Sequence, residues 1–139
     1  MQDQPENSRV DFGNFQLVYE LAELSSFDDT EYIDENYVAI LRFYDPGASV
    51  RVMVTATQLE VWRDYFELSA TRGGAYMETL PIMRTRKEDE STLVTTYGNK
   101  IFFRSGNMII SINLAGCLKE FVNYINEIWR ELDEKENRW

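Results

Sequence analysis

The sequence KIFFRSGNMIISINL at residues 100–114, followed by LKEFVNYINEIWREL at residues 118–132, decides the fold of this chain. Two pairs, Gly98-Asn99 and Gly106-Asn107, separate three runs that are rich in β-branched and aromatic residues. Gly and Asn tolerate the positive φ angles that two-residue hairpin turns require. The pattern therefore predicts a three-stranded antiparallel meander over residues 92–97, 100–105 and 108–114.

Each turn fixes which residues lie opposite one another in the meander. The turn at 98–99 pairs Thr96 with Ile101, and the turn at 106–107 pairs Phe103 with Ile110. Opposite residues share a face of the sheet. One predicted face is nearly all apolar and comprises Val94, Thr96, Ile101, Phe103, Ile110, Ile112 and Leu114. The other face is mixed and comprises Thr95, Tyr97, Phe102, Arg104, Ile109, Ser111 and Asn113.

A long amphipathic helix is predicted directly after the meander. Its apolar residues are spaced by three and four positions, which places them in one stripe along the helix. The stripe comprises Leu118, Phe121, Val122, Ile125, Ile128, Trp129 and Leu132. We expect this stripe to cover the apolar face of the meander.

The first half of the chain follows a similar plan. Alternating or apolar runs predict strands at residues 15–24, 37–44 and 50–55. A helix follows, with a capping box from Thr57 to Glu60 and an end near Ala70. A further strand at 75–84 is interrupted by Pro81, which indicates an edge or a bulge.

The predicted fold class is α+β, with antiparallel sheets and two helices. The elements form two strand-strand-strand-helix units in one domain that spans residues 1–139. The ends are predicted to be a loose tail at 1–11 and a fraying tail at 133–139.

The strongest global signal is charge. The chain has 24 Asp and Glu against 14 Lys and Arg, a net charge of −10. Such a chain should repel nucleic acid and anionic membranes and attract basic proteins. No apolar run approaches the length of a membrane span. The start, MQDQPENSRVDF, is polar and acidic, so we expect no signal peptide and a cytoplasmic protein.

Residues for common catalytic chemistry are scarce. The chain has no His and a single cysteine, Cys117, which removes Ser-His-Asp and Cys-His catalysis and the usual zinc sites. Cys117 stands at the start of the last predicted helix, where the helix dipole can lower a thiol pKa, but a small buried thiol is the simpler interpretation. We therefore predict no enzyme activity, no cofactor and no bound metal.

The acidic residues are better interpreted as a binding surface. Carboxylates grouped around an aromatic side chain can face an Arg- and Lys-rich cleft and imitate phosphates. The predicted partner-binding residues form a first patch of Asp28, Asp29, Glu31, Tyr32, Asp34 and Glu35 and a second patch of Glu88, Asp89 and Glu90. Ordinary solubilising loops would give the same composition.

The order of elements over residues 36–132 resembles the WapI-type immunity proteins of bacterial toxin–immunity systems. The likeness lies in LEVWRDYFELSATRGGAYME at residues 59–78, the meander, and NMIISINLAGCLKEFVNYINEIW at residues 107–129. The resemblance implies a cytoplasmic protein that blocks a cognate toxin, often a nuclease, and it implies no catalytic residues.

The first hypothesis is therefore an immunity or inhibitor protein whose acidic loops occupy the cleft of a basic toxin. A second is a phage-type anti-defence protein that mimics DNA and binds a host nuclease. A third is a small-ligand binder that uses Trp62, Tyr65 and Phe66. A fourth is a homodimer through the mixed face of the meander, with Phe102 and Ile109.

Overall fold

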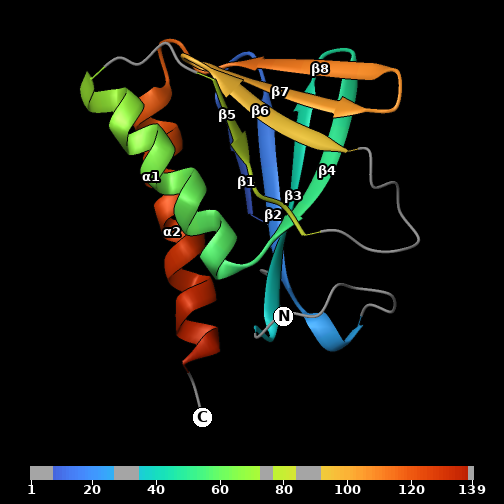
Figure 1. Cartoon of the computed structure of the whole chain (residues 1–139), viewed down its shortest axis with the longest axis vertical. Helices are drawn as coiled ribbons and strands as arrows, with labels where there is room; N and C mark the ends of the chain where they lie inside the picture. Colours follow the sequence, from blue (N-terminus) through green and yellow to red (C-terminus); the bar gives the residue numbers. More distant parts are fainter. Residues whose placement is uncertain (1–7, 27–34, 73–76, 84–91, 138–139) are drawn as a thin grey trace.

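The computed structural model describes residues 8–26, 35–72, 77–83 and 92–137, which form two four-stranded antiparallel sheets and two long helices (Figure 1). Sheet 1 has the strand order β1-β2-β3-β4 and sheet 2 the order β5-β6-β7-β8. The first unit comprises β1 Ser8–Asp11, β2 Gln16–Glu23, a 3-10 turn at Leu24–Ser26, β3 Tyr37–Asp45, β4 Ala48–Val54 and α1 Ala56–Arg72. The second comprises β5 Met77–Leu80, β6 Leu93–Tyr97, β7 Lys100–Ser105, β8 Met108–Asn113 and α2 Leu118–Glu136. The predicted α+β class is confirmed, with four strands rather than three before each helix.

The predicted meander is confirmed in its register. Thr96 lies opposite Ile101 and Phe103 lies opposite Ile110. Both turn glycines adopt positive φ, 63° at Gly98 and 62° at Gly106. Every residue of the predicted apolar face is buried.

The two sheets pack against each other through their apolar faces. The rings of Phe43 on β3 and Phe103 on β7 lie 4.8 Å apart between centroids, and both side chains are fully buried. In Figure 1, β7 and β8 run across one end of sheet 1, and the helices lie together on one side of it. One continuous hydrophobic core therefore takes side chains from both units.

Helix α2 packs against different neighbours from those predicted. It lies against α1 and β3 rather than over the meander. The ring of Phe121 lies 5.3 Å from that of Phe66 on α1 and 6.2 Å from that of Phe15, next to β2. The apolar face of the meander is instead covered by sheet 1, because a second sheet presents a broader apolar surface than one helix stripe.

Helix α1 begins earlier than predicted, at a different capping box. The Thr55 hydroxyl accepts a hydrogen bond from the Gln58 backbone N–H at 3.2 Å, and the Gln58 side chain accepts one from the Thr55 N–H at 3.0 Å. This reciprocal pair is the T-x-x-Q form of the motif. Thr57, the predicted cap, lies inside the first turn.

Replacing Thr55 by alanine is expected to lower the free energy of unfolding by about 1 kcal/mol, because the first turn of α1 loses its side-chain acceptor. Thr71→Ala is the matched control, since that hydroxyl donates to carbonyls within its own helix and caps no helix start. Equilibrium denaturation of both variants is the measurement. An equal loss in the two variants would contradict the assigned cap.

The predictions for both ends of the chain are wrong in part. Within the predicted loose tail, Ser8–Asp11 forms β1, which pairs with β2. Its four residues are too short to show a periodic pattern. Within the predicted fraying tail, α2 continues to Glu136 because that residue and Lys135 contact the start of β3.

Pro81 acts as predicted. It follows the last residue of β5, which is an edge strand, and Met83 then makes an isolated bridge to Met53 on β4. The Pro81 carbonyl accepts a hydrogen bond at 2.8 Å from the indole N–H of buried Trp62. Pro81, which ends the strand, therefore also joins the second unit to α1.

Candidate interaction surfaces

Glu35 is the one predicted partner-binding residue that falls within the described part of the chain. Its carboxylate accepts hydrogen bonds from the Thr57 backbone N–H at 3.0 Å and from the Thr57 hydroxyl at 2.8 Å. A carboxylate is favourable there because the first N–H groups of a helix lack internal partners and carry partial positive charge. Glu35 thus fixes the chain to the start of α1, a role that the sequence did not indicate. The remaining predicted residues lie outside the described part: Asp28, Asp29, Glu31, Tyr32, Asp34, Glu88, Asp89 and Glu90.

The residues on either side of segment 27–34 are joined to each other and to both helices by hydrogen bonds. We define the stem as Leu24, Glu35, Asn36 and Tyr37. The Leu24 N–H donates to the Asn36 carbonyl at 2.8 Å, which joins the two ends of the segment. The Glu136 carboxylate accepts hydrogen bonds from the N–H groups of Asn36 at 2.9 Å and Tyr37 at 2.8 Å. Together with Glu35, these contacts attach the stem to the first turn of α1 and the last turn of α2.

The stem lies beside the most acidic part of α2. The last turns of this helix contain Glu131, Asp133, Glu134 and Glu136. One of these carboxylates, on Glu131, accepts a hydrogen bond from the Tyr19 hydroxyl at 2.8 Å. Negative charge therefore accumulates beside the residues that flank segment 27–34.

The pKa of neighbouring Tyr124 is affected by burial and by these carboxylates. Burial raises the pKa of its phenol well above the usual range, and Tyr19, Glu127 and Glu131 add to the shift. Tyr124 therefore stays neutral at physiological pH.

The outward face of sheet 2 is a second candidate surface. We define the sheet-2 patch as Met77, Tyr97, Lys100, Phe102, Arg104 and Ile109. Met77 lies opposite Tyr97, Tyr97 opposite Lys100, and Arg104 opposite Ile109, so these residues form adjacent cross-strand rows. Met77 is 70% exposed and Ile109 60%. A depression of about 340 Å³ lies over Met77, Tyr97 and Phe102.

The charge of the sheet-2 patch is opposite to that of the whole chain. Lys100 and Arg104 are the charged side chains at its outward positions, and no acidic residue shares this face among the described strands. Exposed aromatic, Met and Arg residues with few acids are typical of protein interfaces. The sequence predicted the mixed meander face but missed Met77, because the register of β5 has no turn signal.

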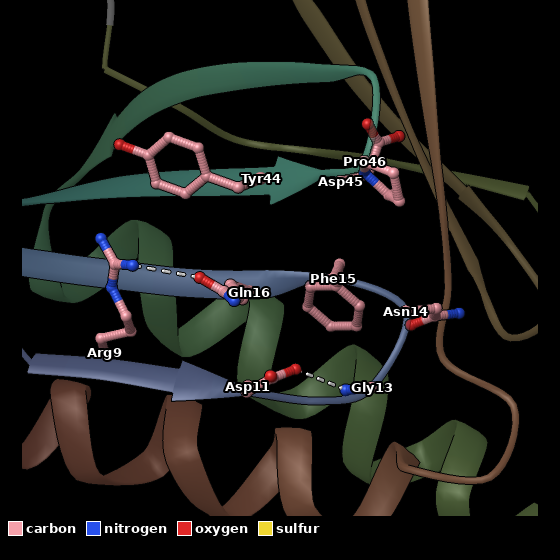
Figure 2. A pocket seen from close by; sticks show the side chains of 9 residues that line it. All are labelled: Arg9, Asp11, Gly13, Asn14, Phe15, Gln16, Tyr44, Asp45 and Pro46. Carbon is pink, nitrogen blue, oxygen red and sulfur yellow. Dashed lines mark hydrogen bonds between the residues drawn. The ribbon is translucent and has the colours of Figure 1, made fainter.

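A polar hollow of about 420 Å³ lies between β1, β2 and the β3–β4 turn (Figure 2). Arg9 lies 5.9 Å above the Tyr44 ring and donates to Gln16 at 3.2 Å. The carboxylates of Asp11 and Asp45 each accept a hydrogen bond at 2.9 Å from the glycine N–H two residues on. Asp11 and Asp45 thus stabilise the turns of two hairpins. Their position at the hollow follows from this structural role, so we assign no ligand to it.

Two further sequence hypotheses concern buried or half-buried groups. Trp62, Tyr65 and Phe66, the proposed ligand-binding aromatics, are all core residues. Half-buried Cys117 directly precedes α2, where burial, with a smaller effect of Glu120, raises the pKa of its thiol. The thiol of Cys117 is therefore less acidic than a free cysteine, and it is half-buried rather than fully buried as the simpler interpretation expected.

Within residues 8–26, 35–72, 77–83 and 92–137, no three or more His, Cys, Asp or Glu residues are grouped so that they could hold a metal ion. Neither helix in these ranges combines the length and apolar character that crossing a membrane requires.

Comparison with known proteins gives no match to a family model, to a curated protein or to a solved structure.

Proposed function

We propose that the protein is a non-catalytic inhibitor of the immunity type, which binds a basic protein such as a toxin nuclease. The observation that carries this proposal is the stem of segment 27–34. The segment contains Asp28, Asp29, Glu31 and Asp34, and both of its ends are fixed to the fold by hydrogen bonds. Anchored ends reduce the conformational entropy that a loop loses on binding, which favours affinity.

Inhibition would follow from occlusion without turnover. The net charge of −10 steers a basic partner toward the protein, and the acids of segment 27–34 then lie against the Arg and Lys residues of its cleft. Close charge pairs at interfaces couple by about 1.5–7 kcal/mol, and exposed pairs weaken as salt rises. Binding should therefore be strong at low salt and reversible at high salt.

The test is capture from a lysate of the source organism on the tagged protein, with elution in a salt gradient and identification by mass spectrometry. Wild type is expected to retain a basic protein. The variant Asp28→Lys/Asp29→Lys/Asp34→Lys is expected to bind it at least about tenfold more weakly, the equivalent of one interfacial charge pair.

The matched control is Glu78→Lys/Glu120→Lys/Glu127→Lys, which makes the same change in net charge at exposed positions of β5 and α2. Equal weakening in both variants would show that only net charge matters and would contradict the assigned site. Recovery of no basic protein by wild type would contradict the proposal. The identity of the captured protein distinguishes a cognate toxin from a host nuclease.

A further inference from the structure

Exposed large apolar side chains are confined to two parts of the described chain. Val61 and Leu68 lie on α1, and the remainder, Met77, Tyr97, Met108 and Ile109, lie on sheet 2. Single exposed apolar residues need no explanation, but grouped ones mark interaction sites. Both groups therefore qualify as docking surfaces.

The α1 group forms an acidic stripe. We define the α1 stripe as Glu60, Val61, Asp64, Glu67 and Leu68. This spacing places all five on the side of α1 opposite the buried Leu59, Trp62 and Phe66. The stripe thus combines three carboxylates with two exposed aliphatic side chains.

Arg63 partly balances the stripe without belonging to it. Its guanidinium lies 3.5 Å from the Glu60 carboxylate, 3.2 Å from that of Asp64 and 4.6 Å from the Trp129 ring centroid. One cation against three carboxylates leaves this side of α1 negative. Exposed ion pairs of this kind are weak and can be exchanged for others.

The α1 stripe and the sheet-2 patch match each other in charge, chemistry and spacing. Lys100 and Arg104 stand four residues apart on β7, about 13 Å along a strand. Glu60 and Glu67 stand seven residues apart on α1, about 10 Å along a helix. The long Lys and Arg side chains span the difference. A helix that lies along β7 would also place Val61 and Leu68 over the apolar residues of the patch, which is the ordinary helix-on-sheet arrangement.

Within one molecule the two surfaces cannot meet. The inward face of sheet 2 is buried, with Phe103 against Phe43, so the patch points away from the core. The inward side of α1 lies in the same core, and α1 is placed to the side of sheet 2 in Figure 1. Their contact therefore requires two molecules.

We propose that the sheet-2 patch of one copy binds the α1 stripe of a second copy. The net charge of −10 opposes association of identical chains, but at physiological salt this repulsion is screened beyond about 8 Å. The patch is the acid-free face of the described sheet 2, so a second copy meets least repulsion there. This inference goes beyond the proposed inhibition and uses none of the residues of segment 27–34.

The test is sedimentation velocity at physiological salt over a wide range of protein concentration. Wild type is expected to associate as concentration rises. The patch variant Lys100→Glu/Arg104→Glu and the stripe variant Glu60→Lys/Glu67→Lys are each expected to associate at least about tenfold more weakly. A mixture of the two variants is expected to associate again, because each reversed surface then meets a complementary one.

The control variant Lys119→Glu/Arg130→Glu changes net charge as the patch variant does, at exposed positions of α2. It is expected to associate much more strongly than the patch variant. A wild type that stays monomeric, a mixture that fails to associate, or a control as weak as the patch variant would each overturn the proposal. All variants keep segment 27–34, so capture of a basic protein by them tests the inhibitor proposal separately.

Discussion

Replacing Phe121 by alanine is expected to lower the free energy of unfolding by about 3–5 kcal/mol, the range for large aromatic residues in protein cores. Phe121 is fully buried, and its ring lies 5.3 Å from Phe66, 5.8 Å from Phe12 and 6.2 Å from Phe15. The substitution leaves a cavity where α2, α1 and the β1–β2 hairpin meet. Equilibrium unfolding in urea, followed by far-UV circular dichroism, measures the loss.

Met77→Ala provides the comparison, because this side chain is 70% exposed on the sheet-2 patch. Its effect is expected to stay within about 0.5 kcal/mol, as for most surface substitutions. If Phe121→Ala cost no more than Met77→Ala, α2 could not be packed as described. Phe121→Leu keeps most of the apolar volume and should recover much of the stability.

Local chemistry explains which parts of the fold could be predicted. The meander register follows from two turns, because Gly98 and Gly106 adopt the positive φ that two-residue hairpins need. Those turns alone fix Thr96 opposite Ile101 and Phe103 opposite Ile110. The inward and outward faces of sheet 2 then follow from the two-residue period of a strand.

Features that depend on distant partners could not be predicted in this way. The sequence around α1 offers two overlapping capping motifs, one starting at Thr55 and one at Thr57. The first is used because β4 ends at Val54, and the Thr57 groups bond instead to Glu35, far away in the sequence. Strand β1 likewise depends on a partner outside itself, since its four residues form a strand by pairing with β2.

In the candidate surfaces, too, the residues placed by local turns could be predicted and those placed by tertiary contacts could not. The outward positions of Tyr97, Phe102 and Ile109 were fixed by the meander register, but Met77 joins them only through the pairing of β5 with β6. Similarly, the acids of segment 27–34 are visible in the sequence, whereas the stem depends on Glu136, a hundred residues from Asn36. Composition alone thus led to the hypothesis that acidic residues bind a partner. Only tertiary contacts identify the residues, such as Glu136, that hold the two ends of segment 27–34.

Separating the chain into residues 1–72 and 73–139 is expected to abolish folding of both parts. The two units resemble each other in element order, but each depends on a contact with the other. Trp62 of the first unit donates to the Pro81 carbonyl of the second, and Phe121 of the second unit packs on Phe12 and Phe15 of the first. The apolar face of each sheet would also lose its cover, since Phe43 and Phe103 pack together.

Chains of about 70 residues bury a smaller fraction of their unfolded surface than larger domains do, so their stability is marginal even with a complete core. Each fragment alone is therefore expected to show no cooperative thermal transition by circular dichroism and little dispersion of amide shifts by NMR. Mixing the fragments should restore both, because the shared core can reassemble without the peptide link. A fragment that unfolds cooperatively by itself would contradict this interdependence and would make its unit an independent domain.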